Sequence, residues 1–226
     1  MAITLAQIKL EARQRSDMEN NTFIAEGELT SYVNNSIAEL YDLLCEAYGS
    51  DYYVTSVEGS IVSGQQGYDL PDDFYELKGV DMKVDNQTWQ TIQRYNFNER
   101  NRYPDGATWN IFGYTDIRYR IVGNKIHFTP TPDGTYTYRL HYVPVATKLV
   151  NDNDELDDLN AYSEYVIVDV AIKLMTKEES DPSVFVMQKQ ALEKRIRDKA
   201  ANRDAAVADT ISDASAENDW WYWRPR

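Results

Sequence analysis

The two histidines, His127 and His141, are the first residues to test for chemistry, because imidazole acts both as a general base and as a metal ligand. Each lies in a run of alternating apolar and polar residues, which predicts a β-strand, and each falls on the polar side of its run. If the two strands are neighbours, the histidines could share one site. A one-sided sheet also places polar residues on its solvent face, and we interpret both histidines in that way.

Two other patterns are typical of ligand sites but lack residues that such sites need. In the acidic run over 151–158, a calcium loop read from Asp152 would put Leu156 at the third ligand position, with no glycine after it. We expect these acids to precede a helix and to complement its dipole. The turn from Gly64 to Gly67 lacks the lysine of a phosphate-binding loop. The sequence therefore predicts no enzyme activity, no metal and no cofactor.

The residues with the strongest potential for binding lie at the end of the chain, where three of the five tryptophans fall within the last seven residues. The preceding stretch, 200–219, is mostly Ala, Asp, Asn and Ser, and it has no apolar face of its own. Trp and Tyr dominate the energetics of interfaces, so this cluster on a polar tether is typical of a docking peptide. The alternative is that it folds back into a groove of its own domain. The predicted partner-binding residues are Trp220, Trp221, Tyr222, Trp223, Arg224 and Arg226.

Charge and composition narrow the possible partners. Lys and Arg total 23 against 37 acids, for a net charge of −14, which predicts weak affinity for duplex DNA but suits a wall that DNA slides past. No apolar run is long enough to span a membrane, and the N-terminus has no signal-peptide pattern. A single cysteine, Cys45, indicates folding in a reducing cytoplasm, and we interpret it as a small core residue.

The sequence before residue 50 predicts two helices. Thr4 and Gln7 fit a capping box, and Ile3 and Ile8 fit the hydrophobic staple around it, so we expect a helix over 5–15. A second helix is expected over 26–48 and ends at Gly49. Its apolar residues recur at spacings of three and four and form one stripe: Leu29, Val33, Ile37, Leu40 and Leu44.

Two more helices are predicted after residue 149. The helix expected over 156–177 is apolar nearly all round at its centre, so it should be the most buried. Asp181 and Pro182 mark the start of another helix, over 182–200, antiparallel to the first. We expect this last helix to be mostly exposed, and we interpret its cations as a solvated face, with docking or DNA contact as the alternative: Lys189, Lys194, Arg195, Arg197 and Lys199.

The middle of the chain is rich in tyrosine, glycine and proline, and predicts strands and turns. Residues 118–121 and 126–128 flank a tight turn at 122–125, and a second turn at 132–135 leads to a strand over 136–142. We expect a meander with one buried face, on which Tyr136, Tyr138, Leu140 and Tyr142 lie. Gln65, Gln66 and the aromatic loop over 95–109 leave open a second function, a soluble carbohydrate- or peptide-binding β module.

The predicted fold class is α+β, a bundle of about four helices with an antiparallel β insertion between the helix pairs and an extended C-terminal tail. The expected organisation is a helical pair over 1–50, the β insertion over 51–148, a helical hairpin over 149–205 and a docking arm over 206–226. We expect the two helical parts to form one body, because each has an apolar surface that needs a partner.

Two blocks of the sequence resemble a known family. The run from Gly64 through Tyr68-Asp69-Leu70-Pro71 to Val80, and the run from Tyr119 to Gly134, are similar to segments of tailed-phage head-to-tail adaptor proteins, with Trp89 at a suitable distance between them. The order of two helices, a strand-rich block, two helices and a tail is also that of the family.

The resemblance implies a structural ring subunit that joins the portal of a phage capsid to the tail or nozzle proteins and lets DNA pass through its centre. It also implies a homo-oligomer, a dodecamer in that family, and a C-terminal arm that grips the portal. The expected location is the capsid–tail junction of the virion, after synthesis in the host cytoplasm.

Overall fold

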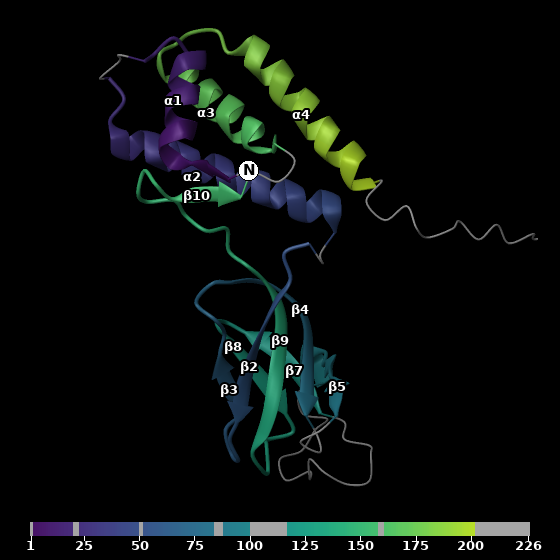
Figure 1. Cartoon of the computed structure of the whole chain (residues 1–226). Coiled ribbons are helices and arrows are strands. Elements are labelled where there is room, and N and C mark those ends of the chain that lie inside the picture. The colour runs from purple at the N-terminus through teal and green to yellow at the C-terminus, as the bar shows by residue number, and fades with distance from the viewer. Residues whose placement is uncertain are drawn as a thin grey trace, which may run out of the picture.

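The chain folds into a helical body and a β body, joined by two chain segments (Figure 1). The computed structural model describes residues 2–19, 23–49, 52–83, 88–99, 117–157 and 161–201. The helical body contains α1 (Leu5–Arg15), α2 (Glu26–Tyr48), α3 (Ser163–Lys177) and α4 (Ser183–Ala201). The strands of the β body all lie between α2 and α3 in sequence, so the predicted fold class is confirmed.

The start of α1 confirms the capping box. The Thr4 hydroxyl accepts a hydrogen bond from the Gln7 amide at 3.3 Å, and the Gln7 side chain accepts one from the Thr4 amide at 3.0 Å. The next two amides, of Leu5 and Ala6, donate to the carbonyls of Asp154 and Asp152. The first turn of α1 is therefore satisfied partly by its own cap and partly by a turn far along the chain.

Replacing Thr4 with alanine should lower the free energy of unfolding of the helical body by about 1 kcal/mol, because the Gln7 amide loses its cap. Chemical denaturation followed by the helical circular dichroism signal measures this change. Thr30→Ala is the matched control, because the Thr30 hydroxyl only bonds back to the Glu26 carbonyl within α2. Equal loss in both variants would mean that the cap contributes nothing specific.

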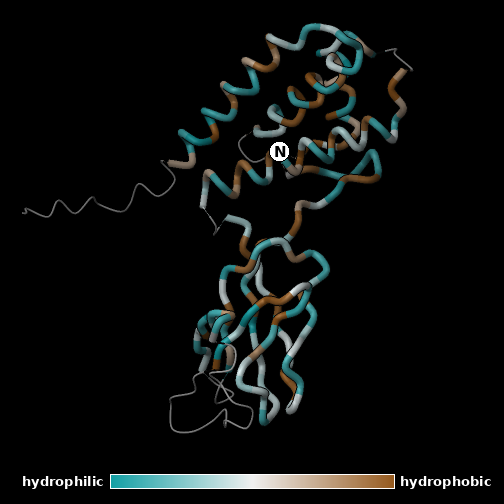
Figure 2. The backbone as a smooth tube through the Cα atoms, turned by 180° about the vertical axis from the view of Figure 1, so that it is seen from behind, coloured by the Kyte–Doolittle hydropathy of each residue, from teal (hydrophilic) through white to brown (hydrophobic). Residues whose placement is uncertain are grey.

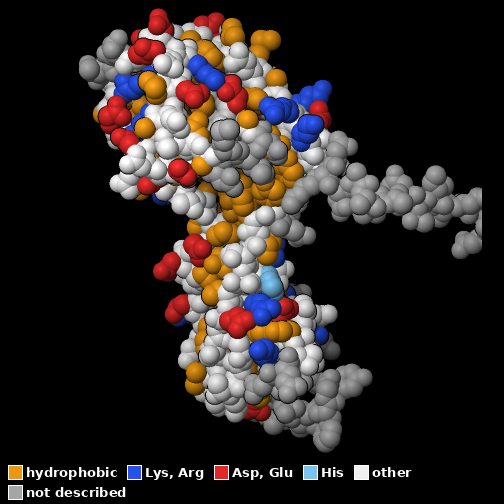
Figure 3. Space-filling model, in the orientation of Figure 1, with side chains coloured by type: hydrophobic (Ala, Val, Ile, Leu, Met, Phe, Trp, Pro, Cys, Tyr) orange, Lys and Arg blue, Asp and Glu red, His pale blue; other side chains and the backbone are white. Residues whose placement is uncertain are grey.

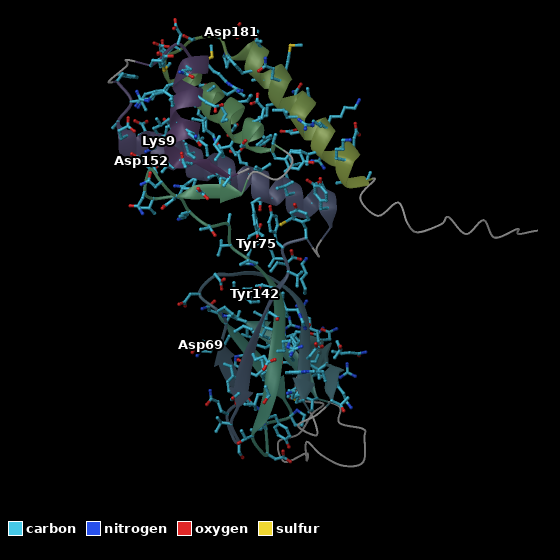
Figure 4. The ribbon with its side chains drawn as sticks, viewed as in Figure 1. Lys9, Asp69, Tyr75, Tyr142, Asp152 and Asp181 are labelled. Atoms are coloured by element: carbon cyan, nitrogen blue, oxygen red, sulfur yellow. The ribbon has the colours of Figure 1, made fainter. Side chains whose placement is uncertain are left out.

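The helix predicted over 156–177 begins later than expected. Glu155–Asp157 instead form a short strand, β10, which pairs antiparallel with β1 (Ala2–Thr4), and α3 begins at Ser163. The acidic run therefore does not lead directly into a helix. Its carbonyls receive the first amides of α1 instead, and the Asp152 carboxylate binds Lys9 at 2.9 Å (Figure 4). The interpretation that these acids complement the dipole of the helix that follows them is wrong.

The helical body has one core to which all four helices contribute, so the expectation that its two parts form one body is confirmed. The α2 stripe is buried as predicted, and α3 is the most buried helix. α4 is more hydrophilic than α3 and buries mainly Ile196 and Ala200 (Figure 2). The fully buried residues of the body include Leu5, Ile8, Ala12, Leu29, Val33, Val166 and Val170.

The β body consists of two four-stranded sheets around a second core. One sheet has the order β2 (Thr55–Ile61), β9 (Tyr136–Pro144), β4 (Phe74–Lys83) and β5 (Trp89–Thr91). The other has the order β3 (Gly67–Asp69), β8 (Lys125–Thr129), β7 (Arg118–Val122) and β6 (Gln93–Arg94), followed along the chain from β6 by a 3-10 turn at Phe97–Glu99. All pairs are antiparallel except the short β6–β7 pair.

The predicted meander is wrong at its second turn. β7 and β8 pair as expected, but β9 lies in the other sheet, between β2 and β4. The connection from β8 to β9 contains Pro130 and Pro132, which cannot donate to a strand ladder. The apolar side of β9 then faces β8 across the core, where the rings of Phe128 and Tyr138 lie 5.3 Å apart. The predicted alternation on β9 holds, since Tyr138, Leu140 and Tyr142 are buried.

Candidate partner-binding surfaces

The two histidines considered for a shared site lie apart in the structure. His127 lies on β8 and His141 on β9, in different sheets, so the shared site considered for them does not form. His141 bonds to the Asp81 carboxylate at 2.9 Å, which joins β9 to its neighbour β4. Among the described residues, no group of three or more His, Cys, Asp or Glu side chains could hold a metal ion.

The glutamines considered for sugar binding stabilise a turn. The Gln66 amide donates to the Thr131 hydroxyl, and the Gln65 amide donates to the Gly67 carbonyl. The aromatic loop over 95–109 is described only as far as Glu99, so the remainder of that candidate surface lies outside the described residues.

The predicted docking residues, Trp220 to Trp223 with Arg224 and Arg226, lie outside the described residues. The described chain ends at Ala201, at the outer end of α4 (Figure 1). Residues 202–219 therefore connect the helical body to the aromatic cluster. α4 is the described element closest in sequence to these residues.

Lys189 and Arg197, among the α4 cations, are paired with acids within the chain. The Lys189 ammonium contacts Asp169 at 2.7 Å and Glu39 at 2.9 Å, and Arg197 contacts Glu46 at 2.9 Å. Burial opposes the charge on Lys189, but these hydrogen bonds outweigh burial and raise its pKa. The interpretation as a solvated face is therefore wrong for Lys189. Lys194 and Lys199 are exposed. Basic side chains gather over α4 (Figure 3).

The junction between the two bodies is a surface that the sequence did not reveal. The Tyr41 hydroxyl donates to the Pro144 carbonyl at 2.7 Å, and the Tyr75 hydroxyl donates to Asp42 at 3.0 Å, so α2 is tied to both β9 and β4 (Figure 4). Hydrophobic side chains gather here (Figure 3). They line a groove of about 160 Å³ that includes Ile37, Ala38, Tyr41, Tyr75, Val145 and Ala146. The only sequence signal was the density of tyrosines between 41 and 53.

Cys45 lies beside this junction and is half-buried. Burial and the nearby Asp42 carboxylate raise the pKa of its thiol. A raised pKa keeps a cysteine protonated and poorly nucleophilic. Cys45 is not the core residue that the sequence predicted but lies at the edge of the helical core.

None of the helices in the described part of the chain is both long enough and apolar enough to cross a bilayer. The features that remain for binding are the exposed side of α4, the apolar junction and, outside the described residues, an acidic stretch of sequence that ends in the aromatic cluster. These features suit binding to other macromolecules.

Comparison with protein families supports this conclusion from the whole sequence. Residues 3–214 match the SU10 adaptor protein family. The matched range covers both bodies and ends before Trp220. A comparison with curated proteins found no match. The family is structural and non-enzymatic, in agreement with the predicted absence of activity. Because the match extends over nearly the whole sequence, the chain belongs to the SU10 adaptor protein family and is a phage head-to-tail adaptor protein.

Proposed function

We propose that the chain is one subunit of a homo-oligomeric ring that joins the portal of a phage capsid to the tail, in the virion, and surrounds the path of the DNA. Membership of the adaptor family carries this proposal. The ring's copy number depends on the angle between neighbouring subunits, and a dodecamer is the value that the family resemblance implies.

In this proposal the aromatic arm binds the portal. Trp220, Trp221 and Trp223 offer large rigid apolar surfaces, and Arg224 and Arg226 add cations that can pair with carboxylates or carbonyls of a partner. The arm is acidic and polar before this cluster, so the tether itself has little tendency to pack on the helical body. The arm then reaches a neighbouring protein while the folded bodies contact tail components and other subunits.

The negative charge suits a channel wall. The chain carries a net charge of −14, and phosphate groups that approach such a surface are repelled rather than held. DNA that must move through a ring during packaging and ejection benefits from weak contacts. The expected affinity of the isolated chain for duplex DNA at physiological salt is accordingly low.

Deletion of residues 218–226 should abolish stable attachment to purified portal rings while leaving the folded bodies intact. The reason is that an interface whose aromatic anchors are removed loses most of its binding energy. Co-sedimentation with portal rings, with native mass spectrometry of the same mixtures, measures the attachment. Circular dichroism of the truncated chain checks that the helical body is unchanged.

The matched control keeps the arm's length and removes only tether side chains. Ser212→Ala with Ser215→Ala should bind portal rings like the parent, whereas Trp220→Ala with Trp221→Ala should bind far less. If the truncated chain co-sediments with portal rings as well as the full chain does, the arm is not the portal-binding element. If the full chain binds neither portal rings nor itself, the proposed ring function is wrong.

A further inference from the structure

We propose that neighbouring subunits of the ring meet through the outer face of α4 on one subunit and the outer face of α1 on the next. This inference rests on the ring of the proposed function. The α4 face consists of Val184, Met187, Ala191 and Lys194. The α1 face consists of Ala6, Leu10 and Gln14, with Asp17 just beyond the C-terminal end of the helix and Asp152 beside its N-terminal end.

The α4 face exposes apolar residues to solvent in the single chain. Val184 is 62% exposed and Met187 is 70% exposed, although both are large hydrophobic residues on a helix. Met187 lies about half a turn around the helix from Ile196, which is buried in the core. The core of the subunit therefore does not need these side chains, and they are available to a partner.

The α1 face has the same character. Leu10 is 53% exposed, on the opposite side of the helix from Leu5, Ile8 and Ala12, which are fully buried. Ala6 and Gln14 lie next to Leu10 at helical spacing and are also exposed. This surface has an apolar centre with polar and acidic residues around it, which is the usual anatomy of an interface.

The two faces lie on different sides of the helical body. α1 and α4 each pack on α3 and on α2, and α3 lies between them (Figure 1). A cyclic ring is built from heterologous contacts, in which one surface of each subunit meets a different surface of the next. Two apolar faces on opposite flanks of one body satisfy that requirement, whereas a single face would give a dimer.

The charges on the two flanks are complementary. On the α1 side, acids lie outermost: the Asp152 and Glu26 side chains are 70% and 69% exposed, while their partners Lys9 and Arg13 are 11% and 14% exposed. On α4, exposed Lys194 lies on the same face as Met187, and exposed Asp198 follows it one turn further on. An α4 face that approaches the α1 flank of another copy therefore brings the Lys194 ammonium towards the outermost carboxylates of that flank.

This complementarity is the reason to assign a second copy as the occupant. Binding to duplex DNA relies on Lys and Arg side chains that neutralise phosphates, whereas the centre of the α4 face carries Val184 and Met187. Both halves of the contact are present on every subunit, which is the condition for self-assembly.

Engineered cysteines test the contact directly. In a Cys45→Ser background, a chain carrying both Leu10→Cys and Met187→Cys should form a ladder of disulfide-linked oligomers under mild oxidation with diamide. A mixture of chains that each carry one of the two cysteines should give cross-linked dimers and no larger species. Both experiments are run on the free chain and on the chain bound to portal rings. Leu10→Cys with Val122→Cys, at an exposed hairpin of the β body, is the control and should give no ladder.

Blocking substitutions provide a second, independent measurement. Met187→Asp and Leu10→Asp should each abolish self-assembly, as measured by native mass spectrometry, while circular dichroism stays like that of the parent. A mixture of the two variants retains one intact contact, between the α1 face of the Met187→Asp chain and the α4 face of the Leu10→Asp chain. That mixture should give a heterodimer that cannot grow.

The outcomes separate this inference from the ring itself. If the parent forms rings and both blocked variants also form rings, or if no cysteine ladder appears, the assignment of the faces is wrong and the ring function stands. If Met187→Asp keeps its assembly but loses portal binding, the α4 face belongs to the portal and the inference is overturned. If the parent neither assembles nor binds portal rings, the proposed function fails first.

Discussion

Val170→Asp should destabilise the helical body by about 4 kcal/mol or more, because it places a carboxylate where no partner or water can reach it. Val170 is fully buried at the centre of α3, within the core that all four helices share. A domain's entire stability is typically about 5–15 kcal/mol, so a loss of this size leaves the helical body largely unfolded on mild heating. The physical reason is that α3 contacts α1, α2 and α4, so none of these helices can move away from it without losing core contacts.

The two cores make the result more specific than a general loss of stability. The β body has its own core, around Phe128, Tyr138 and Leu140, which does not include α3. We therefore expect the helical circular dichroism signal of Val170→Asp to melt early while amides in β2, β9 and β4 stay protected from hydrogen exchange. Val150→Asp is the control, because Val150 is exposed. If Val170→Asp melts like the parent, the position of α3 in the core is wrong.

Local sequence patterns predicted most of the helical body. The capping box at Thr4 and the stripe on α2 depend only on residues within one or two turns, so the sequence contains all that is needed to identify them. β10 could not be found in this way. Its three residues become a strand because β1, near the start of the chain, supplies the partner strand for backbone hydrogen bonds. A pattern confined to residues 155–157 carries no sign of that pairing.

The sheet assignment failed for a related reason. The strands of the β body were visible as alternating runs, but alternation does not say which sheet a strand enters. The pairing of β9 with β2 and β4 places it in its sheet, and the packing of Tyr138 against Phe128 across the core sets it opposite β8. The candidate surfaces follow the same division: the aromatic arm was evident from composition, whereas the junction at Tyr41 and Tyr75 exists only once α2, β4 and β9 meet.

Asp169 is another residue whose role depends on contacts that are distant in sequence. Its carboxylate is almost completely buried on α3, and it accepts hydrogen bonds from Ser36 on α2 at 2.5 Å and from Lys189 on α4 at 2.7 Å. Lys173 forms a third contact at 2.6 Å. Burial opposes ionisation of Asp169, but these three hydrogen bonds outweigh it and lower its pKa. The carboxylate therefore links α2, α3 and α4.

Asp169→Asn should lower the free energy of unfolding by about 3 kcal/mol near neutral pH, because the shape is kept while the two lysines lose their buried counter-charge. A carboxyl group whose pKa is lower in the folded state stabilises the fold above its ordinary pKa, near 3.8, and this stabilisation is lost as the pH falls below that value. The difference in stability between the parent and Asp169→Asn should therefore be largest near neutral pH and shrink on acidification. Asp72→Asn, at an exposed aspartate before β4, should show no such difference at any pH.

A double-mutant cycle tests the ion pair between Asp169 and Lys189 directly. Lys189→Met should lower the free energy of unfolding by less in the Asp169→Asn chain than in the parent. Simple additivity of the two losses would show that this ion pair does not couple α3 to α4.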